Sequence, residues 1–153
     1  MATTAEPRER ATTSVSEDRR GPARQDVVQR ALGAAGLVAI ALIHAADAPS
    51  KYAAADARYI FWLYAALILG CAVDVGLLVL RNTRLMWAFA ALLAAVPFVS
   101  YVISRSVGLP RATDDIGNWL EPLGVASLVV EALLFAFAIV QARRARRARH
   151  DTL

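Results

Sequence analysis

The sequence predicts an all-α protein, a bundle of four transmembrane helices with both termini in the cytoplasm. Three observations predict this fold. Hydrophobic residues make up 58% of the 153-residue chain, and the mean hydropathy is +0.45, which is well above the usual values for a globular domain. These residues form four long apolar runs rather than an alternating pattern, as membrane-spanning helices do. Arginine is concentrated near the two ends of the chain. Together these features argue against a soluble enzyme, a disordered protein and a secreted disulfide scaffold.

The elements follow in chain order. Residues 1–26 are polar, rich in Thr, Glu, Arg and Pro, and lack hydrophobic periodicity, so they are expected to form a disordered tail. A transmembrane domain is expected over 27–142 and a basic cytoplasmic tail over 143–153. Each apolar run is close to the ~20 residues that cross a hydrocarbon core of ~30 Å, and only helices satisfy their own backbone there. The expected spans are about 27–48, 59–80, 85–103 and 120–140.

The distribution of basic side chains predicts the orientation. With both termini inside, thirteen Arg and Lys residues lie on the cytoplasmic side and four on the outer side, which follows the positive-inside rule. Tyr and Trp residues near the expected boundaries fit the aromatic belts of membrane proteins. The sequence therefore predicts a multi-pass protein of a bacterial plasma membrane.

The alternative for the first span is a cleaved signal peptide, since Ala46-Asp47-Ala48 has a small-x-small pattern. Two features oppose cleavage. The polar segment before the span is long and contains acidic residues, and Pro49 would directly follow the cut. The first span is therefore expected to be retained as a helix.

The connections between spans differ in length. The loop Arg81–Arg84 is so short that the second and third helices should be antiparallel neighbours. The outer loops, Pro49–Arg58 and Ser104–Asn118, are longer and offer the surface outside the membrane. Small residues share a helical stripe with the ionisable residues in three of the four spans, and such stripes permit close helix packing in lipid.

Asp74 and Glu131 are the two acidic residues expected deep in the membrane. A charged carboxylate there costs several kcal/mol unless it is paired, hydrated or protonated. The helical rise places both at a similar depth, within ~5 Å. One interpretation is a protonation or cation site of a small proton- or ion-coupled transporter component. The other is a pair of hydrogen-bonded acids that lock helices together, or an ion pair of Asp74 with Arg81 or Arg84.

Four further residues are expected to gather near the outer surface: His44, Asp47, Arg105 and Glu121. His44 and Asp47 are three residues apart and share one helical face. The favoured interpretation is a salt-bridge network in which Arg105 pairs with Asp47 or Glu121. The alternative is a haem, metal or small-ligand site at His44. One histidine with scattered carboxylates lacks the closed Cys/His set of structural zinc and a committed haem ligand, so no cofactor or metal is predicted.

The second outer loop carries two distinctive motifs. Ser-Arg-Ser-Val-Gly-Leu-Pro occupies 104–110, and Asn-Trp-Leu-Glu-Pro-Leu-Gly occupies 118–124. The motif pair resembles that of a family of small four-helix integral membrane proteins of actinomycete type, which implies the same fold and no known activity. In that family a second His and a Glu would follow the position of His44, where this chain has Ala-Pro-Ser-Lys-Tyr at 48–52. The candidate interaction residues of the loop are Gly108, Pro110, Asn118 and Trp119.

Catalytic patterns are absent from the sequence: it has no P-loop, dinucleotide-binding glycine turn, Gly-x-Ser-x-Gly elbow, His-Glu-x-x-His or Cys-x-x-Cys. A non-enzymatic protein is therefore expected, acting as an accessory or interaction subunit of a membrane complex. The alternatives are the transporter component with Asp74 and Glu131, and haem or metal binding at His44. The protein is expected as a monomer, a homo-oligomer or the partner of another membrane protein.

The basic C-terminal segment is expected to anchor the last span and to bind anionic lipid. Basic residues near a charged membrane surface contribute about 1 kcal/mol each, and the positive-inside rule already requires them. Binding of nucleic acid is therefore not expected. The residues concerned are Arg143, Arg144, Arg146, Arg147 and Arg149.

Overall fold

The computed structural model describes the backbone of residues 7–150 and the side chains of residues 24–147. Over these residues the chain folds into four α-helices and one short 3-10 turn. The elements are α1 Pro7–Ala53, η1 Ala55–Ala57, α2 Tyr59–Leu80, α3 Arg84–Ser106 and α4 Pro122–His150. Every α-helix contains a stretch that is long and apolar enough to cross a membrane: Arg24–Ala53, Tyr59–Leu80, Arg84–Ser106 and Pro122–Arg147. The predicted all-α bundle with four membrane-spanning helices is confirmed.

The start of the first helix differs from the prediction of a disordered tail over residues 1–26. In the structure α1 is already helical from Pro7, while residues 1–6 lie outside the described part. Once the apolar span has nucleated a helix, each further residue except Pro22 adds a hydrogen bond without a new nucleation cost. Ala, Arg, Glu and Gln in this stretch are also good helix formers. The same reasoning applies to α4, which continues from the last span through the basic segment to His150.

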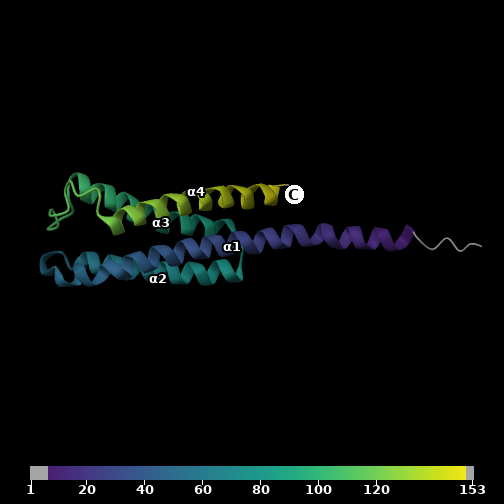
Figure 1. Cartoon of the computed structure of the whole chain (residues 1–153), viewed down its shortest axis with the longest axis horizontal. Helices are drawn as coiled ribbons and strands as arrows, with labels where there is room; N and C mark the ends of the chain where they lie inside the picture. Colours follow the sequence, from purple (N-terminus) through teal and green to yellow (C-terminus); the bar gives the residue numbers. More distant parts are fainter. Residues whose placement is uncertain (1–6, 151–153) are drawn as a thin grey trace, which may run out of the picture.

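The four helices form two antiparallel pairs that lie side by side (Figure 1). α1 packs mainly along α2, and α3 mainly along α4; a smaller contact joins α1 to α4. α2 and α3 are neighbours through the short turn at 81–83, as expected, but they pack on each other less extensively. We call the end formed by residues 54–58 and 107–121 the loop end. The opposite end, where α1 enters and α4 leaves the bundle, is the terminal end (Figure 1).

The core is apolar and closely packed around Trp87. It includes Leu37, Ile40, Leu78, Ala90, Ala94, Leu134 and Ala138. Gly33 of α1 lets Trp87 of α3 approach, because a Cβ atom on Gly33 would lie 2.7 Å from the indole ring. Close approach of this kind stabilises helix pairs in lipid, where apolarity alone gives no preference for protein over lipid. Many large apolar side chains instead cover the outside of the bundle, as expected where lipid is the solvent.

At the terminal end, Asn82 connects the turn between α2 and α3 to the helices on either side. Its Nδ2 donates to Oδ1 of Asp26 at 2.6 Å, and its Oδ1 accepts from Nε1 of Trp87 at 2.6 Å. Arg30 of α1 donates to the Val79 carbonyl at 3.2 Å, where the last carbonyls of α2 lack helical partners and attract a cation. These bonds fix α1 against the end of α2 and the start of α3.

Candidate functional site

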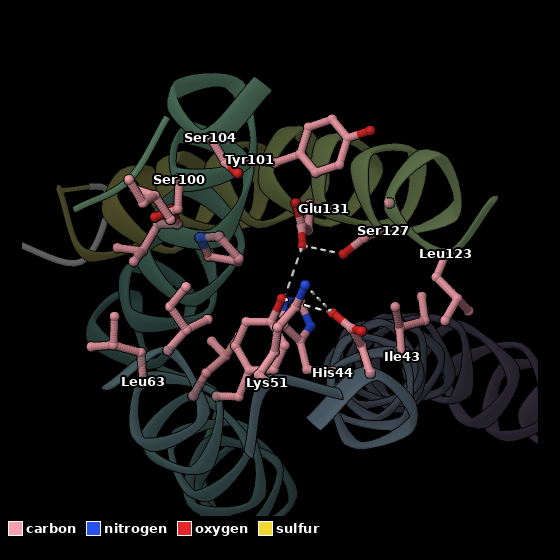
Figure 2. A pocket seen from close by; sticks show the side chains of 18 of the residues that line it. Ile43, His44, Lys51, Leu63, Ser100, Tyr101, Ser104, Leu123, Ser127 and Glu131 are labelled. Carbon is pink, nitrogen blue, oxygen red and sulfur yellow. Dashed lines mark hydrogen bonds and ion pairs between the residues drawn. The ribbon is translucent and has the colours of Figure 1, made fainter. Parts of the chain in front are cut away.

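A cavity of about 430 Å³ lies between the two helix pairs, toward the loop end. Small-molecule sites have volumes of this order. Its wall toward α2 and α3 is mainly apolar and includes Leu63, Leu67, Leu92, Leu93 and Val96, while α3 adds Ser100, Ser104 and Arg105 toward the loop end. Its side toward α1 and α4 is polar and includes His44, Ser127 and Glu131 (Figure 2). The cavity is therefore amphipathic.

The polar side is built around a contact between α1 and α4. Nε2 of His44 lies 3.9 Å from Oε1 of Glu131, and Figure 2 shows these two side chains pointing toward each other. Nδ1 of His44 is 2.9 Å from the Ile40 carbonyl oxygen. Because that oxygen only accepts, Nδ1 carries a hydrogen, and Nε2 is the ring atom left for Glu131. The Tyr64 ring packs against the imidazole in a T-shaped arrangement at 4.7 Å.

Glu131 has one occupied and one free carboxyl oxygen. The Ser127 hydroxyl, one helical turn earlier on α4, donates to Oε1 at 2.5 Å. Glu131 is only 1% exposed, so water does not reach its carboxyl group. Its other oxygen, Oε2, has no hydrogen-bond partner among the described residues. A buried carboxylate oxygen without a partner is unfavourable by several kcal/mol in an apolar setting. Glu131 lines the cavity, and Oε2 is the oxygen of its carboxyl group that still lacks a donor or a cation among the described residues.

A chain of ion pairs crosses the loop end, and its members line the cavity there. Nζ of Lys51 lies 3.5 Å from Oδ2 of Asp47 and 3.7 Å from Oδ2 of Asp115. Arg105 is paired with Asp115 and lies 3.5 Å from Oε2 of Glu121. We call these five residues the outer network. It joins the end of α1, the loop, the end of α3 and the start of α4.

The outer network agrees in part with the cluster predicted from sequence. The pairing of Arg105 with Glu121 is confirmed. Asp47 instead contacts Lys51 and accepts from the Tyr64 hydroxyl at 3.1 Å, and no ion pair between Arg105 and Asp47 occurs among the described residues. Lys51 was missed, although its spacing of four residues from Asp47 is a helical ion-pair signal. Among the described residues His44 has no ion pair with this network; its Nε2 lies 3.9 Å from Oε1 of Glu131.

The loop from α3 to α4 is folded back onto the bundle. The Tyr59 hydroxyl donates to the Pro110 carbonyl at 2.9 Å, and the Tyr101 hydroxyl donates to the Trp119 carbonyl at 3.1 Å. Gly108 adopts a φ of 83°, a left-handed conformation that favours glycine. Of the four candidate interaction residues, Pro110, Asn118 and Trp119 are exposed, and Gly108 is partly buried.

Asp74 lies apart from this site. It is 0% exposed, and both of its carboxyl oxygens lack a hydrogen-bond partner among the described residues. It is not among the described residues that line the cavity. No ion pair or hydrogen bond of the described residues joins it to Glu131, Arg81 or Arg84. The structure therefore does not bring Asp74 and Glu131 together as a contacting pair.

Within residues 24–147, no group of three or more His, Cys, Asp or Glu side chains is placed to hold a metal ion. His44 directs one ring nitrogen to the Ile40 carbonyl and the other to Glu131. The described residues thus provide no second ligand beside His44 for a haem or a metal ion.

Comparisons of the chain with protein-family models, with curated proteins and with solved structures find no match. The chemistry of the cavity is indicated by its own side chains. These supply a free carboxylate oxygen, an oriented imidazole and an apolar wall. Such a combination can bind a small molecule and orient its polar end.

Proposed function

We propose that this protein is a non-enzymatic, multi-pass protein of the bacterial plasma membrane that binds a small molecule from the bilayer. The observation that carries this proposal is the amphipathic cavity between the helix pairs. An apolar pocket with a few convergent polar groups is the usual form of a ligand site. This function is closer to the transporter component considered from sequence than to a purely structural subunit.

Access from the side supports a ligand that comes from lipid. Leu63 on α2 and Leu92 and Val96 on α3 line the cavity, yet they are 59%, 55% and 54% exposed. The cavity wall therefore continues to the outer surface between α2 and α3, which lipid would cover. At the loop end, the charged side chains of the outer network line the cavity, which makes this route less suited to an apolar molecule.

The orientation is part of the proposal. The terminal end carries Arg143, Arg144, Arg146 and Arg147, whose side chains are exposed on α4, while the side chain of Arg149 lies outside the described residues. By the positive-inside rule this end is cytoplasmic. The same arginines are proposed to bind anionic lipid of the inner leaflet. Membership of the four-helix family that the loop motifs resemble stays a prediction.

Native mass spectrometry of protein taken from its own membranes tests the cavity function. We expect one bound small molecule per chain. The substitution Val96→Phe fills the wall of the cavity and should remove this mass. Val99→Phe is the matched control, since Val99 is a similarly exposed valine on α3 that does not line the cavity. A wild-type chain without bound mass, or equal loss in both variants, would contradict the proposal.

The exposed loop end favours a second candidate function, that of an accessory subunit of a membrane complex. Ile116, Trp119 and Leu120 are large apolar residues exposed there, and a patch of exposed apolar side chains marks an interaction site. Arg105 is only 6% exposed and is engaged in the outer network, so it is not part of this surface. A co-purifying chain that is lost on Trp119→Ala would support this function. Retention of every partner by that variant would contradict it.

A further inference from the structure

We propose that the cavity binds an organic cation, with an ammonium head on the free oxygen of Glu131 and an apolar body against α2 and α3. This inference rests on the proposed function, because it names the chemical class of the ligand in the same cavity. Three independent features of the cavity carry it: the carboxyl group of Glu131, the balance of charges around it, and the nature of the opposite wall.

The first feature is the orientation of Glu131. Ser127 holds Oε1, and His44 lies on the same side of the carboxyl group, which leaves Oε2 as the free atom. A carboxylate oxygen accepts hydrogen bonds and attracts positive charge. An ammonium group supplies both, and hydrogen bonds between charged partners are about twice as strong as neutral ones. The ligand group that fits this atom best is therefore a protonated amine.

The second feature is an excess of acidic groups around the cavity. Four carboxylates line it, those of Asp47, Asp115, Glu121 and Glu131. Against them stand the two permanent cations Lys51 and Arg105 and the imidazole of His44, which lies 3.9 Å from Glu131. Both cations are already engaged with acids of the outer network. Among the described residues no unengaged Lys or Arg lines the cavity to receive an anionic head group. In a site of low dielectric constant this imbalance favours a cation and disfavours an anion.

The third feature is the wall opposite Glu131. Leu67, Leu93 and Pro97 offer apolar surface for the body of the ligand, and this wall opens laterally between α2 and α3. The rings of Tyr64 and Tyr101 also line the cavity, and aromatic faces attract cations. A bare metal ion fits less well, because Ca²⁺ and Mg²⁺ require about six or more oxygen ligands. The described residues around Glu131 contain no such cluster.

Three probes with one apolar body and different heads test the inference: adamantylamine, adamantanol and adamantanecarboxylate. Binding is measured by titration calorimetry to the full-length protein in phosphatidylcholine nanodiscs, with empty nanodiscs subtracted to remove partitioning into lipid. We expect the amine to bind about tenfold or more tightly than the alcohol, which corresponds to one charge-assisted hydrogen bond. The carboxylate should bind most weakly.

Substitutions then test whether the preference for the amine depends on the carboxyl group of Glu131. Glu131→Gln should reduce the affinity for the amine to that for the alcohol, whereas Glu131→Asp should retain part of the preference. Asp74→Asn is the matched control, because it neutralises the other buried acid, which does not line the cavity. It should leave the affinities for all three probes unchanged.

The outcomes separate this inference from the proposed function. Equal binding of the amine and the alcohol by the wild-type protein would overturn the cation inference and leave the ligand-binding function standing. This comparison uses only the wild-type protein, so it tests the cation inference even if Glu131→Gln does not fold. Survival of the amine preference in folded Glu131→Gln would overturn the inference too. Absence of saturable binding of every probe would overturn both.

Discussion

Nε2 of His44 lies 3.9 Å from Oε1 of Glu131, so that an imidazole on α1 and a carboxyl group on α4 face each other inside the bundle. Each has a further partner on its own helix, the Ile40 carbonyl for His44 and the Ser127 hydroxyl for Glu131. The two side chains are thereby oriented from both helices. This contact gives the small α1–α4 interface a polar centre next to the cavity.

The first prediction is an energetic coupling between His44 and Glu131. His44→Phe keeps a ring of similar size but removes both ring nitrogens, and Glu131→Gln removes the charge. In a double-mutant cycle of unfolding free energies in mixed micelles, contacting polar residues show couplings of about 0.5–3 kcal/mol. We expect a value in this range. The same cycle between His44→Phe and Asp74→Asn serves as the control and should be additive; a coupling near zero in the first cycle would contradict the contact.

The second prediction concerns Asp74, whose two oxygens are buried without partners among the described residues. Such a group opposes folding, since its desolvation is not offset by hydrogen bonds. Asp74→Asn should leave the free energy of unfolding unchanged or raise it by about 1 kcal/mol, because the amide is less costly to bury than a carboxylate. The measurement is equilibrium unfolding in mixed micelles. A loss of about 3 kcal/mol or more would show that Asp74 has a stabilising partner, as the helix-locking interpretation of the sequence requires.

Much of the fold was predictable because it follows from local composition. The second span, Tyr59–Leu80, was predicted to the residue, since polar residues flank an apolar run on both sides. The start of α1 was not, because helix propagation beyond the membrane leaves no hydrophobic pattern in the sequence. The similar depth expected for Asp74 and Glu131 says nothing about contact, and no hydrogen bond or ion pair of the described residues joins them. Depth in the membrane follows from the helical rise, but the direction in which a side chain points depends on how the helices are rotated and paired.

The dependence on helix rotation and pairing also explains which contacts of the site could be predicted from the sequence. The pairing of Arg105 with Glu121 was predictable, since the two residues lie at the two ends of one loop. The contact between His44 and Glu131 joins the first and last helices, and no spacing rule connects them. The cavity arises from loose packing between α2 and α3. The short turn between these helices predicts that they are neighbours and says nothing about how closely they pack.

The third prediction compares two glycines. A Cβ atom on Gly33 would lie 2.7 Å and 2.8 Å from two atoms of the Trp87 ring, whereas a Cβ atom on Gly76 would meet nothing within 4 Å. Gly33→Ala should therefore lower the free energy of unfolding by about 1–3 kcal/mol, the usual cost of overpacking. Gly76→Ala should raise it by about 0.5–1 kcal/mol through helix propensity. Unfolding in mixed micelles measures both, and equal effects would contradict the close approach of α1 and α3.

The fourth prediction concerns Asn82, which donates to Asp26 and accepts from Trp87. Asn82→Asp keeps the acceptor for Trp87 but places a second carboxylate against Asp26. We expect a loss of about 1–3 kcal/mol in unfolding free energy, typical of an unmade hydrogen bond to a charged group.

Exchanging the two groups provides the control for Asn82. In the double variant Asp26→Asn with Asn82→Asp, the amide on α1 can donate to the carboxylate in the turn. Most of the lost stability should return in the same unfolding measurement. A double variant no more stable than Asn82→Asp alone would show that this hydrogen bond does not hold the turn against α1.

The fifth prediction concerns Arg105, which holds the loop in place. Its side chain is paired with Asp115 and Glu121, and its carbonyl accepts from the Gly117 N–H at 2.9 Å. Arg105→Gln would leave Asp115 and Glu121 without their buried cation, a change that costs about 3–5 kcal/mol where such a pair is fully buried. Because both acids here are partly exposed, we expect a smaller effect, local to the loop. Amide hydrogen exchange over residues 107–121 should become at least tenfold faster, as a local loss of about 1.4 kcal/mol implies.

Arg111 supplies the matched control for that experiment. It is an exposed arginine in the same loop, and no ion pair among the described residues involves it. Arg111→Gln removes the same charge from the loop end, so it should leave exchange over 107–121 unchanged. Equal acceleration in the two variants would show that overall charge, rather than the ion pairs of Arg105, orders the loop. Faster exchange in Arg105→Gln alone would show that the ion pairs of Arg105 hold the loop in place at the loop end of the cavity.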